Sequence, residues 1–432
     1  MFRTFINAFK IPELKKKLLV TALILVLYRI GACLPVPFVD ASTLTQQMEL
    51  YSGSAFSLLN LFSGNSFTQS TLFALGVSPY ITASIVVQLL TVAFPKLAGT
   101  GEEGKKRMQN ITRYMSIGVS LITAIGYYML VKNNGAIMDG YEGFFFAVII
   151  VACYCAGASL VMWLGEKINE HGIGNGISLI LFANIISGVP AVVNMFINTI
   201  VDEPLFGSIF VVCAMALMSA LIWLVIYISD SERRIPVMYA KKVVGRKMYG
   251  GQSTSLPIKL NMTGVMPIIF ANAIVSIPST IRMFVTPTKG TFWDKFFNAF
   301  TTDSWVYAIL SLVLIIAFAY FYSAISFNPI EVATNMQKNG GSIPGIRPGR
   351  ATSDFITKVV SRITFIGALY LAVISVLPIV IQLILNFFVT GYSIAAFAFG
   401  GTSIIIVVGV ILETQREIEA QMTMRHYKGF LE

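Results

Sequence analysis

The sequence predicts an all-α, polytopic membrane protein. Hydrophobic residues make up 56% of the 432-residue chain and charged residues 12%, which is about half the ~25% charged residues of an average soluble domain. Ten apolar segments are each long enough, at about 20 residues, to cross a bilayer as a helix. They lie at 19–38, 72–94, 111–131, 144–164, 173–200, 205–229, 264–285, 305–327, 363–383 and 392–412. The basic N-terminal segment leads directly into the first span, so we expect no removable signal peptide.

The distribution of positive charge predicts the orientation of these spans. Of the 31 Lys and Arg residues, 26 fall in segments on one side, four fall on the other, and Arg29 lies inside the first span. Because positively charged loops stay in the cytoplasm, we expect both termini to be cytoplasmic.

Ten spans divide into two groups of five, at residues 1–200 and 201–432. With an odd number of spans per half, the second half enters the membrane in the opposite direction to the first. This permits two inverted five-helix halves around a central path. The similarity between the halves is too weak, from the sequence alone, to demonstrate a repeat.

A short apolar stretch at about 54–66 precedes the second span. As a helix it would extend about 20 Å, too short to cross the bilayer. Two interpretations stay open on physical grounds: a short helix folded back into the protein, or an amphipathic helix on the membrane surface. Its apolar residues are Phe56, Leu58, Leu59, Leu61 and Phe62, and its small or polar residues include Asn60, Gly64 and Asn65.

The spans contain few groups that could carry chemistry. Their interiors hold no Asp or Glu, and both histidines, His171 and His426, lie in cytoplasmic segments. This argues against an ion-coupled carrier, which usually places such groups at membrane depth. Arg29 is assigned to snorkelling or to pairing with a carbonyl. The sequence has no motif of a metalloprotease, serine hydrolase or nucleotide-binding loop, so we expect no enzyme activity, no metal and no cofactor.

Branched aliphatic residues recur in the spans that contain proline and in neighbouring spans. Val77, Ile81, Leu181, Ile269 and Ile406 could form a hydrophobic constriction if they converge. For any one of them alone, ordinary core packing or lipid contact is the commoner role.

Two long basic loops, at about 231–263 and 328–362, lie on the predicted cytoplasmic side. Positive charge there sets topology, but topology does not need long loops. Their charge and turn residues suit docking to an acidic protein surface or to nucleic-acid phosphate.

Several motifs in the right order resemble the bacterial SecY family of protein-conducting channel subunits. They are LFALGVSPYITASIVVQLL at 72–90, HGIGNGISLI at 171–180, RRIPVMYAKKVVGRK at 233–247, QSTSLPIKLNMTGVMPIIFA at 252–271, FNPIEVATNMQKNGGSIPGIRPG at 327–349 and FGGTSIIIVVGV at 399–410. The resemblance covers nearly the whole chain.

The resemblance implies a clamshell of two halves around an hourglass pore, with residues 54–66 as a movable plug. A plug must leave its position, so we expect its packing to be loose. A lateral gate would open between the second and third spans and the seventh and eighth, with Gln88 and Asn261 as its polar members. The implied pore ring consists of Ile81, Leu181, Ile269 and Ile406, with Val77 and Val87 as further candidates.

The resemblance also implies partners and a location. Arg246, Lys247 and Arg347 would form the docking surface for the SecA motor and the ribosome. SecE, SecG, signal peptides, unfolded secretory or membrane protein chains and the lipid bilayer would be the other partners, at the bacterial cytoplasmic membrane.

The leading hypothesis is therefore a passive subunit that conducts unfolded secretory proteins across the membrane and releases transmembrane segments laterally into it. The alternatives are a small-solute secondary transporter of inverted-repeat architecture and a membrane insertase or scaffold without an open pore. The lack of acidic residues in the spans and the long basic loops favour the channel.

Overall fold

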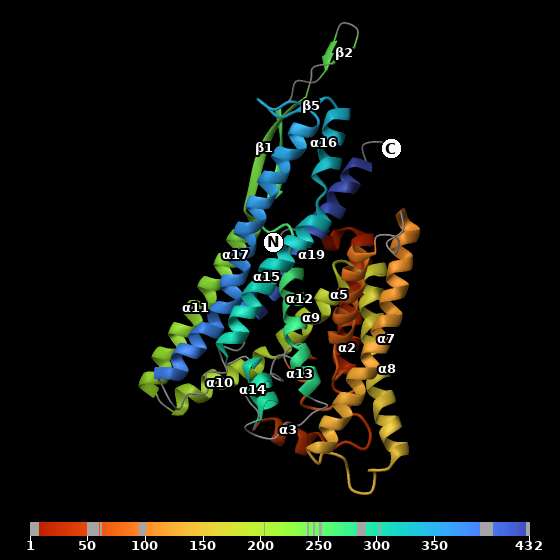
Figure 1. Cartoon of the computed structure of the whole chain (residues 1–432), viewed down its shortest axis with the longest axis vertical. Helices are drawn as coiled ribbons and strands as arrows, with labels where there is room; N and C mark the ends of the chain where they lie inside the picture. The colour runs from red at the N-terminus through yellow and green to blue at the C-terminus, as the bar shows by residue number, and fades with distance from the viewer. Residues whose placement is uncertain are drawn as a thin grey trace.

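The computed structural model describes residues 8–49, 60, 63–94, 101–202, 204–239, 242–244, 247–249, 253–282, 291–301, 304–388 and 401–428. The helices form one elongated bundle, and a small β-structure projects from one end of it (Figure 1). The first part of the chain forms α2 (Pro12–Gly31), α3 (Ala41–Glu49), α5 (Ser78–Ala93), α7 (Gly101–Asn133), α8 (Phe144–His171), α9 (Gly176–Ser187) and α10 (Val189–Asp202).

The second part adds both helices and strands. Its helices are α11 (Pro204–Asp230), α12 (Met266–Val275), α13 (Ile277–Arg282), α14 (Phe292–Ala299), α15 (Trp305–Ser326), α16 (Pro329–Lys338), α17 (Arg350–Phe388) and α19 (Gly401–Lys428). Its strands are β1 (Glu232–Tyr239), β2 (Lys242–Val244), β3 (Lys247–Tyr249), β4 (Ser253–Lys259) and β5 (Gly341–Ser342).

The helical class predicted from the sequence is confirmed. A helix, or two consecutive helices, lies at each of the ten predicted spans; in the tenth the described part starts at Gly401. By length and composition, six of the described helical segments can cross a membrane, and α5 and the α12–α13 region are shorter apolar helices. The count of ten membrane spans stays a prediction.

Two predicted spans are broken near proline. The fifth divides into α9 and α10 at Gly188, and the seventh divides into α12 and α13 at Ser276. Pro190 and Pro278 follow two residues later, where a proline removes a backbone donor and crowds the preceding turn. Pro378, in contrast, lies inside α17 without ending it.

The predicted boundaries of the first two spans are wrong by about two turns of helix. α2 already ends at Gly31, and α5 begins only at Ser78. Between them the chain runs back on itself: Pro35 forms an isolated bridge with Thr71. The backbone N–H of Leu72 donates to the carbonyl of Leu34 at 2.8 Å. The sequence Leu-Pro-Val-Pro at 34–37 explains the early end, because proline and the residue before it disfavour a helix.

The two basic loops contain strands that the sequence analysis did not predict. β1 pairs antiparallel with β4 over seven residue pairs from Glu232↔Lys259 to Met238↔Ser253. β1 also pairs antiparallel with β5, through Met238↔Ser342 and Tyr239↔Gly341. The sheet order β4–β1–β5 therefore joins the loop at 231–263 to the loop at 328–362.

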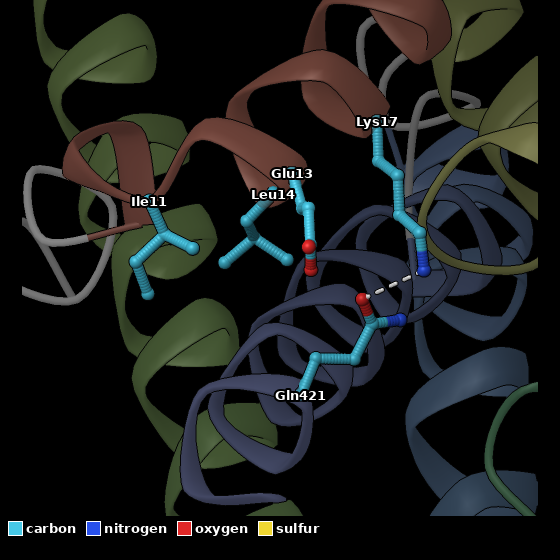
Figure 2. Close-up of a pocket in the computed structure, with 5 residues that line it drawn as sticks. All are labelled: Ile11, Glu13, Leu14, Lys17 and Gln421. Atoms are coloured by element: carbon cyan, nitrogen blue, oxygen red, sulfur yellow. Dashed lines mark hydrogen bonds between the residues drawn. The ribbon is translucent and has the colours of Figure 1, made fainter. Parts of the chain in front are cut away.

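The first and last helices meet near the sheet end of the bundle. Leu14 of α2 packs in one buried cluster with Ile173 and Ile418. Lys17 Nζ donates to Gln421 Oε1 at 3.1 Å across a small pocket between the two helices (Figure 2). The described ends of the chain thus lie together, as the predicted orientation requires.

Candidate functional site

Five of the six pore-ring candidates belong to the main apolar core, which both parts of the chain build. Leu181 and Ile406 have 0% exposed surface. The helices that carry these residues, α5, α9, α12 and α19, lie around the middle of the bundle (Figure 1). Val87 is buried at 3% exposure, but outside this core. The core members among the candidates are Val77, Ile81, Leu181, Ile269 and Ile406.

Ile81 and Ile269 are presented by the same local structure. Both follow the pattern Gly-Val-x-Pro-x-Ile, at 76–81 and 264–269. The two glycines have φ of 55° and 63°, in the left-handed region that favours glycine. The two valines that cap the helices have φ and ψ of −91° and −9° (Val77) and −92° and −8° (Val265). The proline follows in the first turn of α5 and α12, where its missing N–H costs no helical hydrogen bond.

Leu181 and Ile406 share a second pattern, Gly-x-Ser-x-Ile-Leu/Ile, at 176–181 and 401–406. Its serines, Ser178 and Ser403, are each 1% exposed. The hydroxyls of both lack a hydrogen-bond partner in the part of the chain that the structure describes. The two patterns occur in the predicted second and seventh spans and in the fifth and tenth. A five-helix repeat would give this spacing, and the two short patterns can be found in the sequence by direct comparison.

The described end of the predicted plug is held by side-chain hydrogen bonds. Asn60 Nδ2 donates to Asn65 Oδ1 at 3.1 Å, and Ser63 Oγ donates to the carbonyl of Asn60 at 3.0 Å. The backbone N–H of Phe67 in turn donates to Ser63 Oγ at 3.0 Å. Thr68 Oγ1 donates to Asn60 Oδ1 at 3.2 Å. These polar residues therefore close a compact turn.

The expectation of loose packing is wrong for this end of the plug. Ser63 and Ser66 are 2% and 1% exposed. Phe67, which directly follows the plug, packs on Tyr127 within a second buried cluster. Asn60, Gly64 and Asn65 lie in the described part. The other predicted plug residues lie outside the described residues: Phe56, Leu58, Leu59, Leu61 and Phe62.

Gln88 of the predicted lateral gate is bonded across the two halves. Tyr322, on α15, donates its hydroxyl to Gln88 Oε1 at 2.6 Å. Gln88 Nε2 donates to Ser84 Oγ at 3.1 Å within α5. The ring of Tyr322 packs on Phe270 of α12, with centroids 5.2 Å apart. The sequence analysis missed Tyr322, although a phenol hydroxyl in an apolar span needs a hydrogen-bond partner.

Asn261, the other predicted gate residue, lies between β4 and α12. Its Oδ1 is buried and has no hydrogen-bond partner within the described ranges. Within the described residues, Asn261 Oδ1 does not accept a hydrogen bond from Gln88.

Two of the three predicted docking residues, Lys247 and Arg347, lie at the sheet end of the molecule. Arg347 is exposed, and its carbonyl accepts a hydrogen bond from Thr352 Oγ1 at 2.9 Å, which holds it against the start of α17. Lys247 begins β3, and Arg246 lies outside the described residues. Arg347 is thus the one member of this set whose surroundings the structure describes.

An all-helical bundle whose apolar centre collects aliphatic residues from both halves defines a polytopic membrane protein of the channel or carrier class. A family model described as SecY matches residues 71–415. The chain belongs to the SecY family. It is 42% identical to the protein translocase subunit SecY of Mycobacterium tuberculosis over 454 aligned positions, and 40% identical to that of Streptomyces coelicolor over 451. Both alignments cover 100% of each chain.

Solved structures give the same fold. The structure titled "The structure of a protein conducting channel" matches with a TM-score of 0.64 at 19% identity, over 94% of this chain and 92% of that chain. Sec61 in the canine ribosome–channel complex from the endoplasmic reticulum matches with a TM-score of 0.60 at 18% identity, with the same coverage. At these identities the match concerns the fold alone.

Proposed function

We propose that this chain is the channel-forming subunit of a protein translocase in the bacterial cytoplasmic membrane. It conducts unfolded secretory proteins and releases transmembrane segments sideways into the lipid. Membership of the SecY family supports this function over a small-solute carrier. The channel itself is passive and catalyses no reaction, so the driving force comes from a partner.

The observation that carries this proposal is the convergence of the aliphatic candidates. Two pairs of equivalent residues, Ile81 with Ile269 and Leu181 with Ile406, come from matching patterns in the two halves and are buried in one core. A ring of aliphatic side chains excludes water and ions while closed. It also offers a moving chain no fixed hydrogen bonds, so it can pass many sequences. The same pairing supports a division into two inverted halves at about residue 200.

The gate and the partners follow from the same function. Residues 54–66 form the plug, and the seam between α5 and α15, closed by the Gln88–Tyr322 bond, is part of the lateral gate for signal peptides. The basic loops, with Arg246, Lys247 and Arg347, dock SecA or the ribosome on the cytoplasmic side, where both termini also lie. SecE and SecG complete the complex. Sec61, which shares this fold, occurs in a ribosome–channel complex, and this supports a ribosome as a partner.

The proposal is tested by stalling a secretory precursor in transit and placing single cysteines at Ile81, Leu181, Ile269 and Ile406. We expect all four to crosslink to the middle of the precursor. A matched control cysteine at Leu121, which is 48% exposed on α7, should react with lipid-dissolved reagents instead. Crosslinks from Leu121 but from none of the four would contradict the channel.

A further inference from the structure

Arg29 lies against the predicted plug at Gly64. A Cβ atom built on Gly64 would come within 2.9 Å of Arg29 Nη1, 2.8 Å of Asn184 Oδ1 and 2.9 Å of Ser187 Oγ. Gly64 also has a φ of 64°, which other residues adopt only with strain. Only glycine therefore lets the plug backbone approach these three polar groups so closely.

The guanidinium is poorly satisfied in this position. Arg29 Nη1 is buried and has no hydrogen-bond partner among the residues that the structure describes. A buried donor without a partner is costly, and more so when it belongs to a charged group. Arginine cannot avoid this cost by losing its proton.

Its neighbours are already engaged with each other. Tyr28 donates its hydroxyl to Asn184 Oδ1 at 2.8 Å, and its ring stacks on Phe73 with centroids 5.3 Å apart. Ser187 Oγ donates to the carbonyl of Asn184 at 2.7 Å. Arg29 lies in the last turn of α2, where the negative end of the helix dipole favours a cation. The charge is thus held in place beside the described end of the plug.

We propose that Arg29 sets how readily the plug leaves. In this structure Gly64 covers Nη1, and displacement of the plug would return this donor to water. The desolvated Nη1 then favours release, and the burial of Ser63 and Ser66, with the hydrogen bond from Ser66 Oγ to the carbonyl of Ala32, opposes it. This inference rests on the proposed role of residues 54–66 as the plug.

The experiment measures plug displacement directly in the full chain, expressed with its partner subunits in membrane vesicles. The four native cysteines are replaced, and a single cysteine at Ser66, 1% exposed in the closed structure, is labelled with a membrane-impermeant maleimide. The labelling rate reports the fraction of displaced plug. Arg29→Met, which keeps the chain length but removes the charge, should label about tenfold more slowly than the parent, because the unsatisfied buried donor is gone. It should also export precursors more slowly.

Three further variants test this interpretation. Arg29→Lys keeps the charge and should label at least as fast as the parent. Arg29→Gln should slow labelling in the same direction as Arg29→Met, and it replaces Arg29→Met if that variant does not fold. Gly64→Ala should label faster and leak ions, because its methyl group meets all three polar atoms.

The outcomes separate this inference from the proposed function. If Arg29→Met and Arg29→Gln label as fast as the parent, or faster, Arg29 does not favour release and the inference is overturned. If a translocating precursor fails to accelerate labelling of the parent itself, residues 54–66 are not a plug, and the proposed function loses its gate.

Discussion

The hydroxyl of Tyr322 and the amide of Gln88 join helices that belong to different halves of the chain. A hydrogen bond between helices in a membrane contributes about 1 kcal/mol. That amount is small compared with the total free energy that stabilises the fold. It is large enough to change the ratio of closed to open seams about fivefold. Single polar contacts of this kind can therefore set how often a gate opens.

Tyr322→Phe removes this bond and keeps the ring on Phe270. We expect export of a precursor with a weakened signal peptide to rise about fivefold, the factor that corresponds to about 1 kcal/mol. The measurement is the export rate in reconstituted vesicles. Tyr320→Phe, which changes a more exposed hydroxyl on the same helix, is the matched control. Equal rates for both variants would show that the bond does not restrain the gate.

Ser178 and Ser403 are buried beside the ring without hydrogen-bond partners in the described residues. Each unsatisfied hydroxyl costs about 1–3 kcal/mol, so Ser178→Ala with Ser403→Ala should raise the thermal unfolding temperature. Ser323→Ala is the control, because Ser323 shares a 2.8 Å hydrogen bond with Thr364 and its loss should lower that temperature. If the unfolding temperature of the Ser178→Ala, Ser403→Ala variant fell as it does for Ser323→Ala, the two serines would have hydrogen-bond partners in the membrane.

At the scale of residues, the family motifs supplied the candidates for the ring and the gate, and five of the six ring candidates lie in one apolar core. Their roles stay predictions. It could not locate contacts between distant polar side chains. Tyr322 and Gln88 are 234 positions apart, and Tyr28 and Asn184 are 156 apart. No local pattern encodes such a pairing.

Among the elements, α14 differs from the spans around it. It is short, lies at the end of the bundle opposite the sheet (Figure 1), and carries Phe292 and Trp293 at 73% and 56% exposure. Phe297, one turn after Trp293 and in ring contact with it, is only 4% exposed and so faces the protein. Aromatic residues on one face of a short helix beside membrane spans are typical of the membrane–water interface.

We expect brominated lipids with bromines near the headgroup to quench Trp293 strongly in a variant that keeps it as the only tryptophan. Fluorescence in reconstituted vesicles measures this. A second variant, with Trp293→Phe and Phe297→Trp, should be quenched much less, because position 297 faces the protein. Equal weak quenching of both would place α14 in water.

The helices were easier to predict than the strands for a physical reason. A helix satisfies its own backbone, so an apolar run and its prolines reveal it. β1 has a short alternation, with Ile235 and Val237 buried between exposed residues, but it contains Pro236 and many charges. Its second partner, β5, lies about a hundred residues away and is two residues long.

For the whole molecule, one pattern is shared by α5 and α12 and another by α9 and α19, which supports the proposed division into two equivalent halves. From the sequence, the halves were predicted from the even division of spans and from the family resemblance. Short patterns of five or six residues are lost in an overall comparison, because the lipid-facing residues between them are free to differ. The geometry of the two valine caps makes the equivalence visible.

A charge reversal at Arg347 tests how the whole molecule docks to its cytoplasmic partner. Arg347→Glu should reduce motor-driven export about tenfold or more, since reversing one charge at an interface costs on the order of 1–2 kcal/mol. The amount of folded protein in the membrane should not change, because the side chain is exposed. Lys106→Glu, which reverses an exposed charge near the start of α7 and outside both basic loops, is the control. Normal export by the Arg347 variant would remove this residue from the docking surface.

The pairing of β1 with β5 also has a mechanical consequence. β1 continues from α11, and β5 precedes α17, whose Ile356, Val360 and Ile363 pack on Ile235, Val237 and Ile258 of the sheet. α17 has 39 residues, so it extends about 58 Å, far beyond the ~30 Å hydrocarbon layer. The sheet and α17 therefore form one rigid unit. We expect a partner that displaces either loop outside the membrane to tilt α17. Because α17 packs on α15, this tilt would move the helix that carries Tyr322 at the seam.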